Sequence, residues 1–140
     1  MTKVYLAHSH RHRQDTKWLE HQISGWGHQV YNPFDGDDHA RQLTREWEAA
    51  EEAGDLDGLR GLCAAIYHKD LSHIADSEAT VVYYPDESTG TAMEIPIAHR
   101  LKKTVIVLTD IIHPFIHGNA DHVLPLNDAG LEQLRKLLEK

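Results

Sequence analysis

The sequence predicts an α/β domain: a three-layer sandwich in which helices cover both faces of a five-stranded, mostly parallel sheet. Short apolar runs of the buried-strand type alternate along the chain with segments of helical periodicity, as is typical of parallel sheets. The 140 residues are 41% hydrophobic and 26% charged, which is ordinary for a soluble protein. A chain of this length forms one core, so we expect a single domain over residues 1–140.

The first part of the chain has the pattern strand, helix, strand. Residues 3–7 are a short, mostly apolar run, which indicates a buried strand. Apolar side chains recur at helical spacing over residues 15–25, and glycines then end the predicted helix. A weaker strand at residues 28–31 stops at Pro33.

The next segment, residues 35–60, is the least regular part of the chain. It is rich in Asp, Glu, His and Gly, and helical periodicity is visible only over residues 43–53. We expect this segment to pass over the ligand side of the sheet. A second long helix is predicted over residues 59–76.

The rest of the chain continues the alternation of strands and helices. A strand of β-branched and aromatic residues covers 79–84, and a helix follows over 88–102. Another strand is expected at 104–108, a short last strand at 122–124, and a final helix at 128–139. We expect a flavodoxin-like strand order, in which ligands bind beyond the carboxyl ends of the strands.

Charge and composition exclude several classes of function. The 14 Lys and Arg residues against 22 Asp and Glu give a net charge of −8, which argues against binding a nucleic acid polymer but not against one small anion in a local pocket. No apolar run is long enough for a membrane span, and no signal peptide is visible. The single cysteine, Cys63, excludes an internal disulfide framework, so we expect a cytoplasmic protein.

The segment after the first strand offers groups that hold a phosphate. Ser9 supplies a hydroxyl, Arg11 and Arg13 supply charge, and the next helix supplies its N-terminal dipole. A solvated loop with a basic helix start explains the same residues. Three alternating histidines also suggest metal ligation: His8, His10 and His12. Because a metal hydrolase of that type needs a larger barrel, we expect no metal.

Two acidic residues stand out on the predicted helices. Asp70 interrupts an apolar helical face, so its charge must be paired, protonated or at the edge of a cavity. A boundary aspartate bonded to a backbone N–H explains it as well. Gly90 lets the backbone approach a ligand at a helix start. Glu94 fits a capping box with Thr91, and the residues alone favour that cap over catalysis.

Three segments together resemble the nucleoside 2-deoxyribosyltransferase-like superfamily in order and spacing. They are Val4-Tyr5-Leu6-Ala7 with its polar loop, Tyr67 to Asp76, and Gly90 to Ile95. The resemblance covers residues 3–108, with 35–60 poorly matched. It implies that Glu94 is a nucleophile and that Asp70 interacts with the departing base. It also implies that the tyrosine in the first segment orients the nucleophile.

Within the superfamily, the chain is more similar to the 2′-deoxynucleoside 5′-phosphate N-hydrolases. Ser9-His10-Arg11 resembles their phosphate loop, and Ser88 stands six residues before Glu94, where transferases tend to carry an aspartate. The resemblance implies that Ser9, Arg11 and Ser88 hold a phosphate. Two departures are His8, where a glycine is typical, and Ile95 to Ala98, where the family has a Gly-Tyr-Ala-like segment.

The function implied is cleavage of the N-glycosidic bond of a (deoxy)nucleoside 5′-monophosphate through a covalent glycosyl–Glu94 intermediate, with Asp70 and Tyr5 assisting and no cofactor. One alternative is a nucleoside deoxyribosyltransferase, in which a second base replaces water. Another is a non-catalytic nucleotide-binding module, in which Glu94 only caps its helix. A metal hydrolase comes last.

The loop from Asp110 to Asp121 suggests an oligomer. It is long for a βα connection and contains apolar side chains, so burial against a second subunit is expected, giving a homodimer or higher homo-oligomer. The alternative is that these side chains fold back onto their own domain. The resemblance implies that this loop completes a neighbour's site, and Asn119, 25 residues after Glu94, is the residue we expect to do so.

Overall fold

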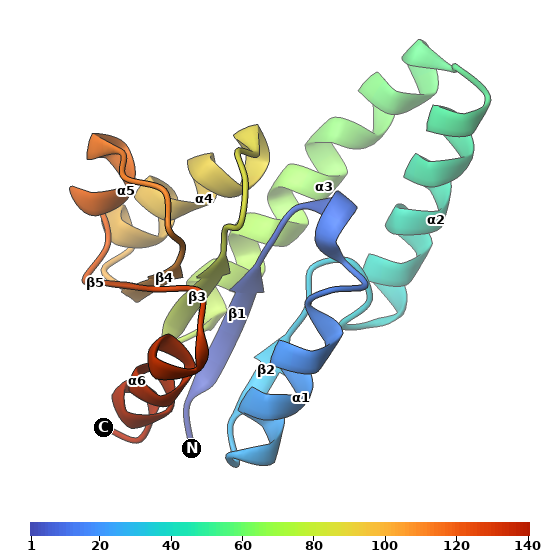
Figure 1. Cartoon of the computed structure of the whole chain (residues 1–140). Coiled ribbons are helices and arrows are strands. Elements are labelled where there is room, and N and C mark those ends of the chain that lie inside the picture. The colour runs from blue at the N-terminus through green and yellow to red at the C-terminus, as the bar shows by residue number, and fades with distance from the viewer.

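A twisted sheet of five parallel strands forms the centre of the molecule (Figure 1). The computed structural model describes residues 1–140. The strands are β1 (Lys3–Ala7), β2 (Gln29–Tyr31), β3 (Ala79–Tyr83), β4 (Thr104–Leu108) and β5 (His122–Leu124). Their order is β2-β1-β3-β4-β5, and every neighbouring pair is parallel. This confirms the flavodoxin-like order that the sequence predicts.

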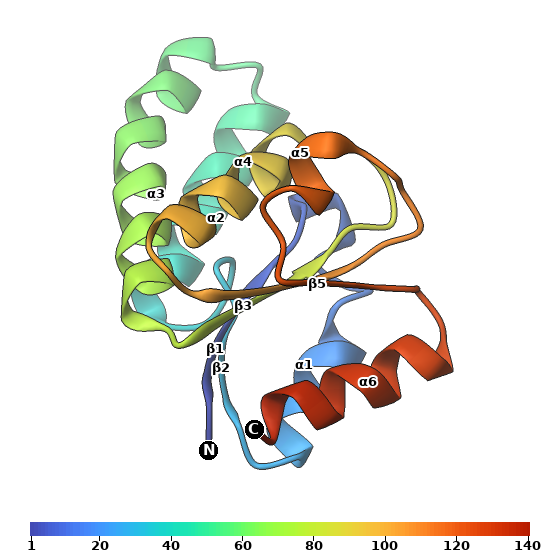
Figure 2. The same ribbon diagram turned by 90° about the vertical axis from the view of Figure 1, so that its left-hand side faces the viewer.

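Helices cover both faces of the sheet, as Figure 2 shows from its edge. One face carries α1 (Lys17–Gly25) and α6 (Asp128–Leu138). The other carries α3 (Leu56–Asp76), α4 (Thr89–Arg100) and the short α5 (Pro114–His117). The three-layer prediction is therefore confirmed.

Alternation along the strands builds a core on each face. In β1, Val4 and Leu6 pack toward α1 and α6, while Tyr5 and Ala7 pack toward α3 and α4. All four side chains are fully buried. This two-sided burial explains why the strands appear in the sequence as continuous apolar runs rather than alternating ones. It also places the Tyr5 ring on the α4 side of the sheet.

The irregular segment 35–60 forms most of a long helical hairpin. Helix α2 (Asp38–Glu52) and helix α3 run side by side and rise beyond the end of the sheet (Figure 1). Both helices begin earlier than predicted because aspartates cap them: Asp37 accepts a hydrogen bond from the Ala40 N–H, and Asp55 accepts one from the Gly58 N–H. Gly54, at φ +66°, makes the turn between them.

The cap at the start of α4 also differs from the prediction. The helix begins at Thr89 with Ser88 as its N-cap residue, so Glu94 is too far along the helix to cap it. The capping-box interpretation is wrong, and the Glu94 side chain is free for another partner.

The loop before β5 partly folds back onto its own chain. Ile116 is buried and Ile111 packs against the core, whereas Ile112 and Phe115 are 88% and 74% exposed. None of the helices combines the length and apolar character needed to cross a membrane.

Candidate active site

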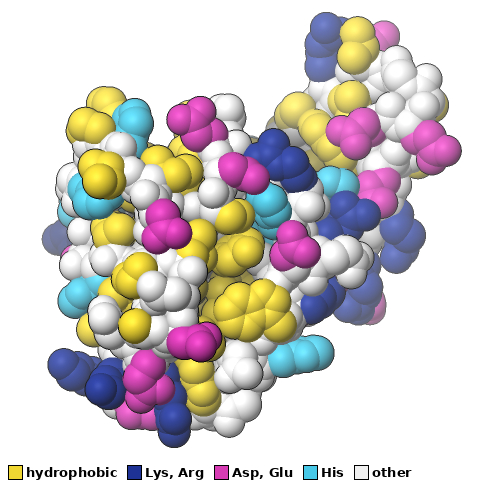
Figure 3. All heavy atoms as spheres, in the orientation of Figure 1, with side chains coloured by type: hydrophobic (Ala, Val, Ile, Leu, Met, Phe, Trp, Pro, Cys, Tyr) yellow, Lys and Arg dark blue, Asp and Glu magenta, His cyan; other side chains and the backbone are white.

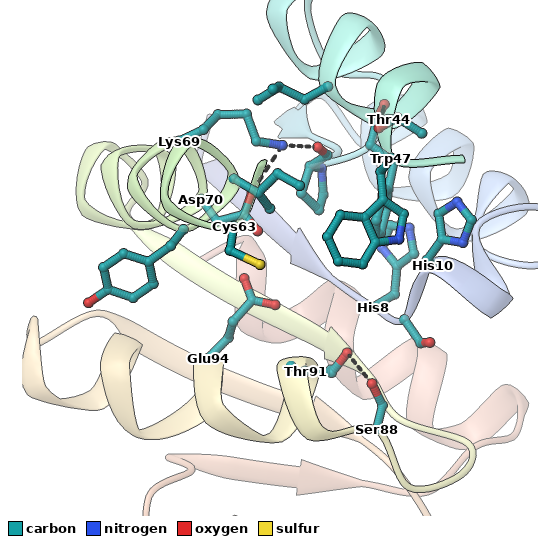
Figure 4. Close-up of a pocket in the computed structure, with 17 residues that line it drawn as sticks. His8, His10, Thr44, Trp47, Cys63, Lys69, Asp70, Ser88, Thr91 and Glu94 are labelled. Atoms are coloured by element: carbon teal, nitrogen blue, oxygen red, sulfur yellow. Dashed lines mark hydrogen bonds and ion pairs between the residues drawn. The ribbon is translucent and has the colours of Figure 1, made fainter. Parts of the chain in front are cut away.

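A cavity of about 460 Å³ opens where β1 ends, at the foot of the helical hairpin. Figure 3 shows the hairpin standing clear of the rest of the molecule, and Figure 4 looks into the cavity below it. The lining residues come from five places: the loop after β1 (His8, Ser9, His10), the loop after β2 (Pro33, Phe34), α2 (Leu43, Thr44, Trp47), α3 (Cys63, Ile66, Tyr67, Lys69, Asp70), and the start of α4 with the residue before it (Ser88, Gly90, Thr91, Glu94). The location fits the rule for parallel sheets, since the cavity lies beyond the carboxyl ends of the strands.

Glu94 is held at the buried end of this cavity by Tyr5. The Tyr5 hydroxyl donates a hydrogen bond of 2.6 Å to Oε2 of Glu94, which joins β1 to α4 across 89 residues of sequence. Tyr5 itself is fully buried. The hydrogen bond orients the carboxylate toward the cavity, where Figure 4 shows it pointing.

The surroundings of Glu94 disfavour its charge. Burial, followed by the negative charge of Asp70, raises its pKa from 4.5 to about 8, while the Tyr5 hydrogen bond and the Lys69 charge oppose this rise. A glutamate with a pKa near neutrality is poised to exchange a proton, as the acids and bases of enzyme active sites are.

Asp70 lies opposite Glu94 on α3 and is paired with its neighbour in sequence. Its Oδ1 lies 3.0 Å from Nζ of Lys69, so the aspartate is ion-paired rather than bonded to a backbone N–H. Burial raises the pKa of Asp70, and the Lys69 charge works against that rise. The interruption of the apolar face therefore marks the wall of a cavity, one of the three possibilities that the sequence left open.

Lys69 is a site residue that sequence reasoning missed. It is only 8% exposed, lines the cavity, and donates a hydrogen bond to the carbonyl oxygen of Pro33. No local signal marks it, because side chains adjacent in sequence on a helix do not face each other.

The polar mouth of the cavity contains only some of the residues expected to hold a phosphate. Ser9, Ser88 and Gly90 line it, but Arg11 does not. The Arg11 guanidinium instead forms an ion pair with Asp86 and donates to the carbonyl oxygen of Glu87. The structure thus brings together two of the three residues expected to hold a phosphate.

Lack of space does not require a glycine at position 90. A side chain there would meet nothing within 4 Å, so the position faces the open cavity. Nearby, the Ser88 hydroxyl donates a hydrogen bond of 3.2 Å to the Thr91 hydroxyl.

His8 sits in the buried wall and supplies no charge. It is 2% exposed, and its Nδ1 lies 3.0 Å from the carbonyl oxygen of Leu6, which makes Nδ1 the protonated nitrogen. Burial lowers the pKa of His8 to about 4, so the ring is neutral near pH 7. His10 and His12 pair separately with Glu48 and Asp86. No group of three His, Cys, Asp or Glu side chains in the chain is arranged to hold a metal ion.

Helix α2 supplies an apolar wall that the sequence did not assign. Leu43 and Trp47 stand one helical turn apart on the face toward the cavity, next to Phe34. Their spacing was visible in the sequence, but the capping role of Asp37, which brings Leu43 well inside the helix, was not recognised.

Asn119 lies away from the cavity of its own chain. Its side-chain amide donates to the carbonyl oxygen of Phe115 at 2.7 Å, and it is not among the lining residues.

The fold of the chain is similar to the folds of solved structures. No protein-family model and no curated protein matches the sequence. Among solved structures, the chain is similar to the 2-deoxyribosyltransferase from the psychrotolerant bacterium Bacillus psychrosaccharolyticus, with a TM-score of 0.67 and 21% identity over 95% of this chain and 90% of that one. It is also similar to the CMP N-glycosidase BcmB from Clostridium botulinum, with a TM-score of 0.53 and 20% identity over 96% and 97%.

These likenesses show that the chain has the fold of these two proteins, as the resemblance predicts.

Proposed function

We propose that this protein is an enzyme that cleaves the N-glycosidic bond of a (deoxy)nucleoside 5′-monophosphate, with Glu94 as its nucleophile. The observation that carries the proposal is the Tyr5–Glu94 hydrogen bond at the buried end of a cavity whose opposite wall holds Asp70. Enzymes that cleave glycosidic bonds usually carry two carboxyl groups, one on either side of the reacting centre and each in a different environment. The two structural neighbours are named as a transferase and an N-glycosidase, which supports this class of reaction.

The mechanism follows from the positions of the two carboxyl groups. The Glu94 oxygen attacks the anomeric carbon, the bond from that carbon to the base nitrogen breaks, and the electron pair of that bond stays with the base. Asp70 passes a proton to the departing base, and the negative charges nearby stabilise the positive charge that develops on the sugar. Water then cleaves the glycosyl–Glu94 ester, so the configuration at the anomeric carbon is retained overall.

The apolar wall of the cavity suits the base. Phe34 and Trp47 offer aromatic faces on the side formed by the hairpin, and stacking against such rings tolerates any base.

A 5′-phosphate would bind at the polar mouth, where Ser9 and Ser88 offer hydroxyls. Arg11 would join them by leaving Asp86, and both side chains of that ion pair are more than half exposed. Exposed ion pairs contribute little stability, so the exchange of partner costs little. Each hydrogen bond to a charged group contributes roughly 1.5–3 kcal/mol, which makes the phosphate a strong anchor.

One observation favours a second candidate, a nucleoside deoxyribosyltransferase. With Arg11 bound to Asp86, no arginine lines the cavity, and its mouth then suits an uncharged 5′-hydroxyl better than a phosphate dianion. In that reaction a second base takes the place of water. The likeness to a 2-deoxyribosyltransferase supports this candidate as well.

We also propose that the protein works as a homodimer or higher homo-oligomer. The exposed side chains of Ile112 and Phe115 support a contact between subunits, because such side chains are costly to leave in water. Asn119, in the same loop, would then reach a neighbour's cavity.

The test is a panel of nucleosides and nucleoside monophosphates, incubated with the protein with and without a free acceptor base and resolved by chromatography. We expect release of free base from a monophosphate without an acceptor. Base exchange that needs an acceptor would favour the transferase. Saturable binding without turnover would contradict both and leave a nucleotide-binding module.

A further inference from the structure

Lys69 is a buried cation in direct contact with one of the two proposed reacting groups, Asp70. Its ammonium is 3.0 Å from Oδ1 of Asp70 and donates to the carbonyl oxygen of Pro33, in the loop after β2. A lysine that is only 8% exposed is rare unless its charge is compensated. Neither the periodicity of α3 nor the family resemblance gives this residue a role.

The two carboxyl groups of the cavity have unequal partners. Asp70 faces a full positive charge, whereas Glu94 receives only a hydrogen bond from the neutral hydroxyl of Tyr5. Figure 4 shows the two carboxyl groups on opposite sides of the same space. Two carboxylates withdrawn from water in one site do not both ionise readily, so they tend to keep a proton between them. That proton belongs on the group without the cation, which is Glu94.

We propose that Lys69 is a positioning residue that fixes at one the number of protons shared by Asp70 and Glu94. The proposal deepens the proposed function, because that single proton is the one the leaving base needs. On substrate binding it passes from Glu94 to Asp70, which leaves Glu94 ionised for attack. As the bond between sugar and base breaks, its electron pair stays on the base nitrogen, and Asp70 gives that nitrogen the proton. Lys69 keeps its charge throughout.

The electrostatic environment supports a single proton shared by Asp70 and Glu94. Burial and the charge of Asp70 raise the pKa of Glu94 to about 8, while Tyr5 and Lys69 oppose the rise. Burial raises the pKa of Asp70, and the charges of Lys69 and His73 lower it. Other ionisable side chains line the cavity or act on the pair through their charge: Tyr5 from β1, Tyr31 from β2, His8 and His10 from the segment after β1, and Cys63, Tyr67, Lys69 and His73 from α3.

Without the Lys69 charge, both carboxyl groups would hold protons more tightly. The pair would then carry two protons near neutral pH, and Glu94 would ionise only in more alkaline solution. A variant that removes the charge should therefore lose activity mainly at neutral pH and recover part of it as the pH rises. A purely structural loss would lower activity by the same factor at every pH.

The first arm of the test needs no substrate. Lys69→Gln removes the charge but keeps a hydrogen-bond donor, Lys69→Arg keeps the charge, and Lys3→Gln is the control, because Lys3 pairs with Asp76 outside the cavity. The melting temperature of each protein is measured from pH 5 to pH 10, with and without Glu94→Gln. A buried glutamate with a raised pKa destabilises the fold progressively from about its unfolded pKa of 4.5 up to its folded pKa of about 8.

The gain in melting temperature from Glu94→Gln should therefore grow with pH and level off near pH 8 in wild type, Lys69→Arg and Lys3→Gln. In the Lys69→Gln background we expect the gain to keep growing at least one pH unit further. Superimposable curves in wild type and Lys69→Gln would overturn the proposal. So would failure of both Lys69→Gln and Lys69→Met to fold at any pH, since Lys69 would then be a structural residue.

The second arm is the pH dependence of kcat/KM for a substrate that is turned over. The acid limb should move up by at least one pH unit in Lys69→Gln and stay in place in Lys69→Arg. A uniform loss across the pH range would overturn the proposal. If no nucleotide or nucleoside is turned over, the proposed function fails, whereas the melting curves still decide the role of Lys69.

Discussion

The two ends of the cavity are built in different ways. At the buried end, the buried side chains of Tyr5 and Lys69 hold Glu94 and Asp70, through contacts of 2.6 and 3.0 Å. At the mouth, Arg11 pairs with an aspartate in solvent, where both side chains are more than half exposed.

The difference indicates that the two ends of the cavity have different functions. Polar groups that are withdrawn from water must find partners within the protein, so their geometry is fixed before a substrate arrives. Solvated groups exchange partners at little cost. We therefore expect the buried end to set the rate of the chemical step and the mouth to set affinity. Each substitution below tests one side of that division.

Glu94→Gln should abolish the reaction, lowering kcat by at least about 10³-fold, because the amide cannot form the ester intermediate. The fold should survive, since the amide occupies the same space and Glu94 caps no helix. Activity assays with far-ultraviolet circular dichroism as the folding control provide the check. Turnover within tenfold of wild type would remove Glu94 from the mechanism.

Asp70→Asn should lower kcat by roughly 10²–10⁴-fold for a base that leaves poorly. The loss should be much smaller for an activated base, which needs no proton to depart. Kinetics on a pair of substrates that differ only in leaving group give the comparison. If both substrates slow by the same factor, Asp70 does not assist the leaving base.

Tyr5→Phe should lower kcat by about tenfold to a hundredfold at pH 7, because it removes a hydrogen bond to a carboxylate worth about 1.5–3 kcal/mol. The Tyr5 hydrogen bond lowers the pKa of Glu94, so its loss moves that pKa upward from about 8. The alkaline limb of the rate profile, where the pair loses its shared proton, should therefore move to higher pH. An unchanged limb would show that Tyr5 does not tune Glu94.

Arg11→Ala should raise KM for a monophosphate about tenfold, leave kcat nearly unchanged, and hardly affect the unphosphorylated nucleoside. Asp86→Asn sharpens this test, because it releases Arg11 from its ion pair and should lower the same KM. Steady-state kinetics on both substrates provide the check. A wild-type preference for the nucleoside would contradict phosphate binding and favour the transferase.

The sequence predicts the sheet well because the strands are buried on both faces. The run at residues 104–108 is β4 to the residue, and the strand expected at 79–84 extends one residue beyond β3. Such runs depend only on local composition. The two helices of the hairpin were harder to predict, because the residues at which they begin are set by the capping aspartates Asp37 and Asp55. Many acidic residues in a sequence cap no helix, so these two do not stand out.

The site also contains some residues that the sequence indicates and others that it does not. Asp70 stands out because a charge interrupts an apolar helical face, and Glu94 becomes a candidate through the family resemblance. The contacts between distant segments have no local signal. Lys69 reaches a carbonyl 36 residues away in the chain, and Arg11 meets Asp86 across 75 residues. Only the folded chain shows that this arginine is held outside the cavity.

The central claim is that Glu94 forms a covalent bond with the sugar. The most direct measurement is the intact mass of the protein after acid quenching during turnover, followed by mapping of any adduct to a peptide. We predict an added mass of one sugar phosphate, or of one sugar if a nucleoside is the substrate. It should lie on the peptide that contains Glu94 and be absent from Glu94→Gln. An adduct on another residue, or substantial turnover by the Glu94→Gln protein, would contradict the account.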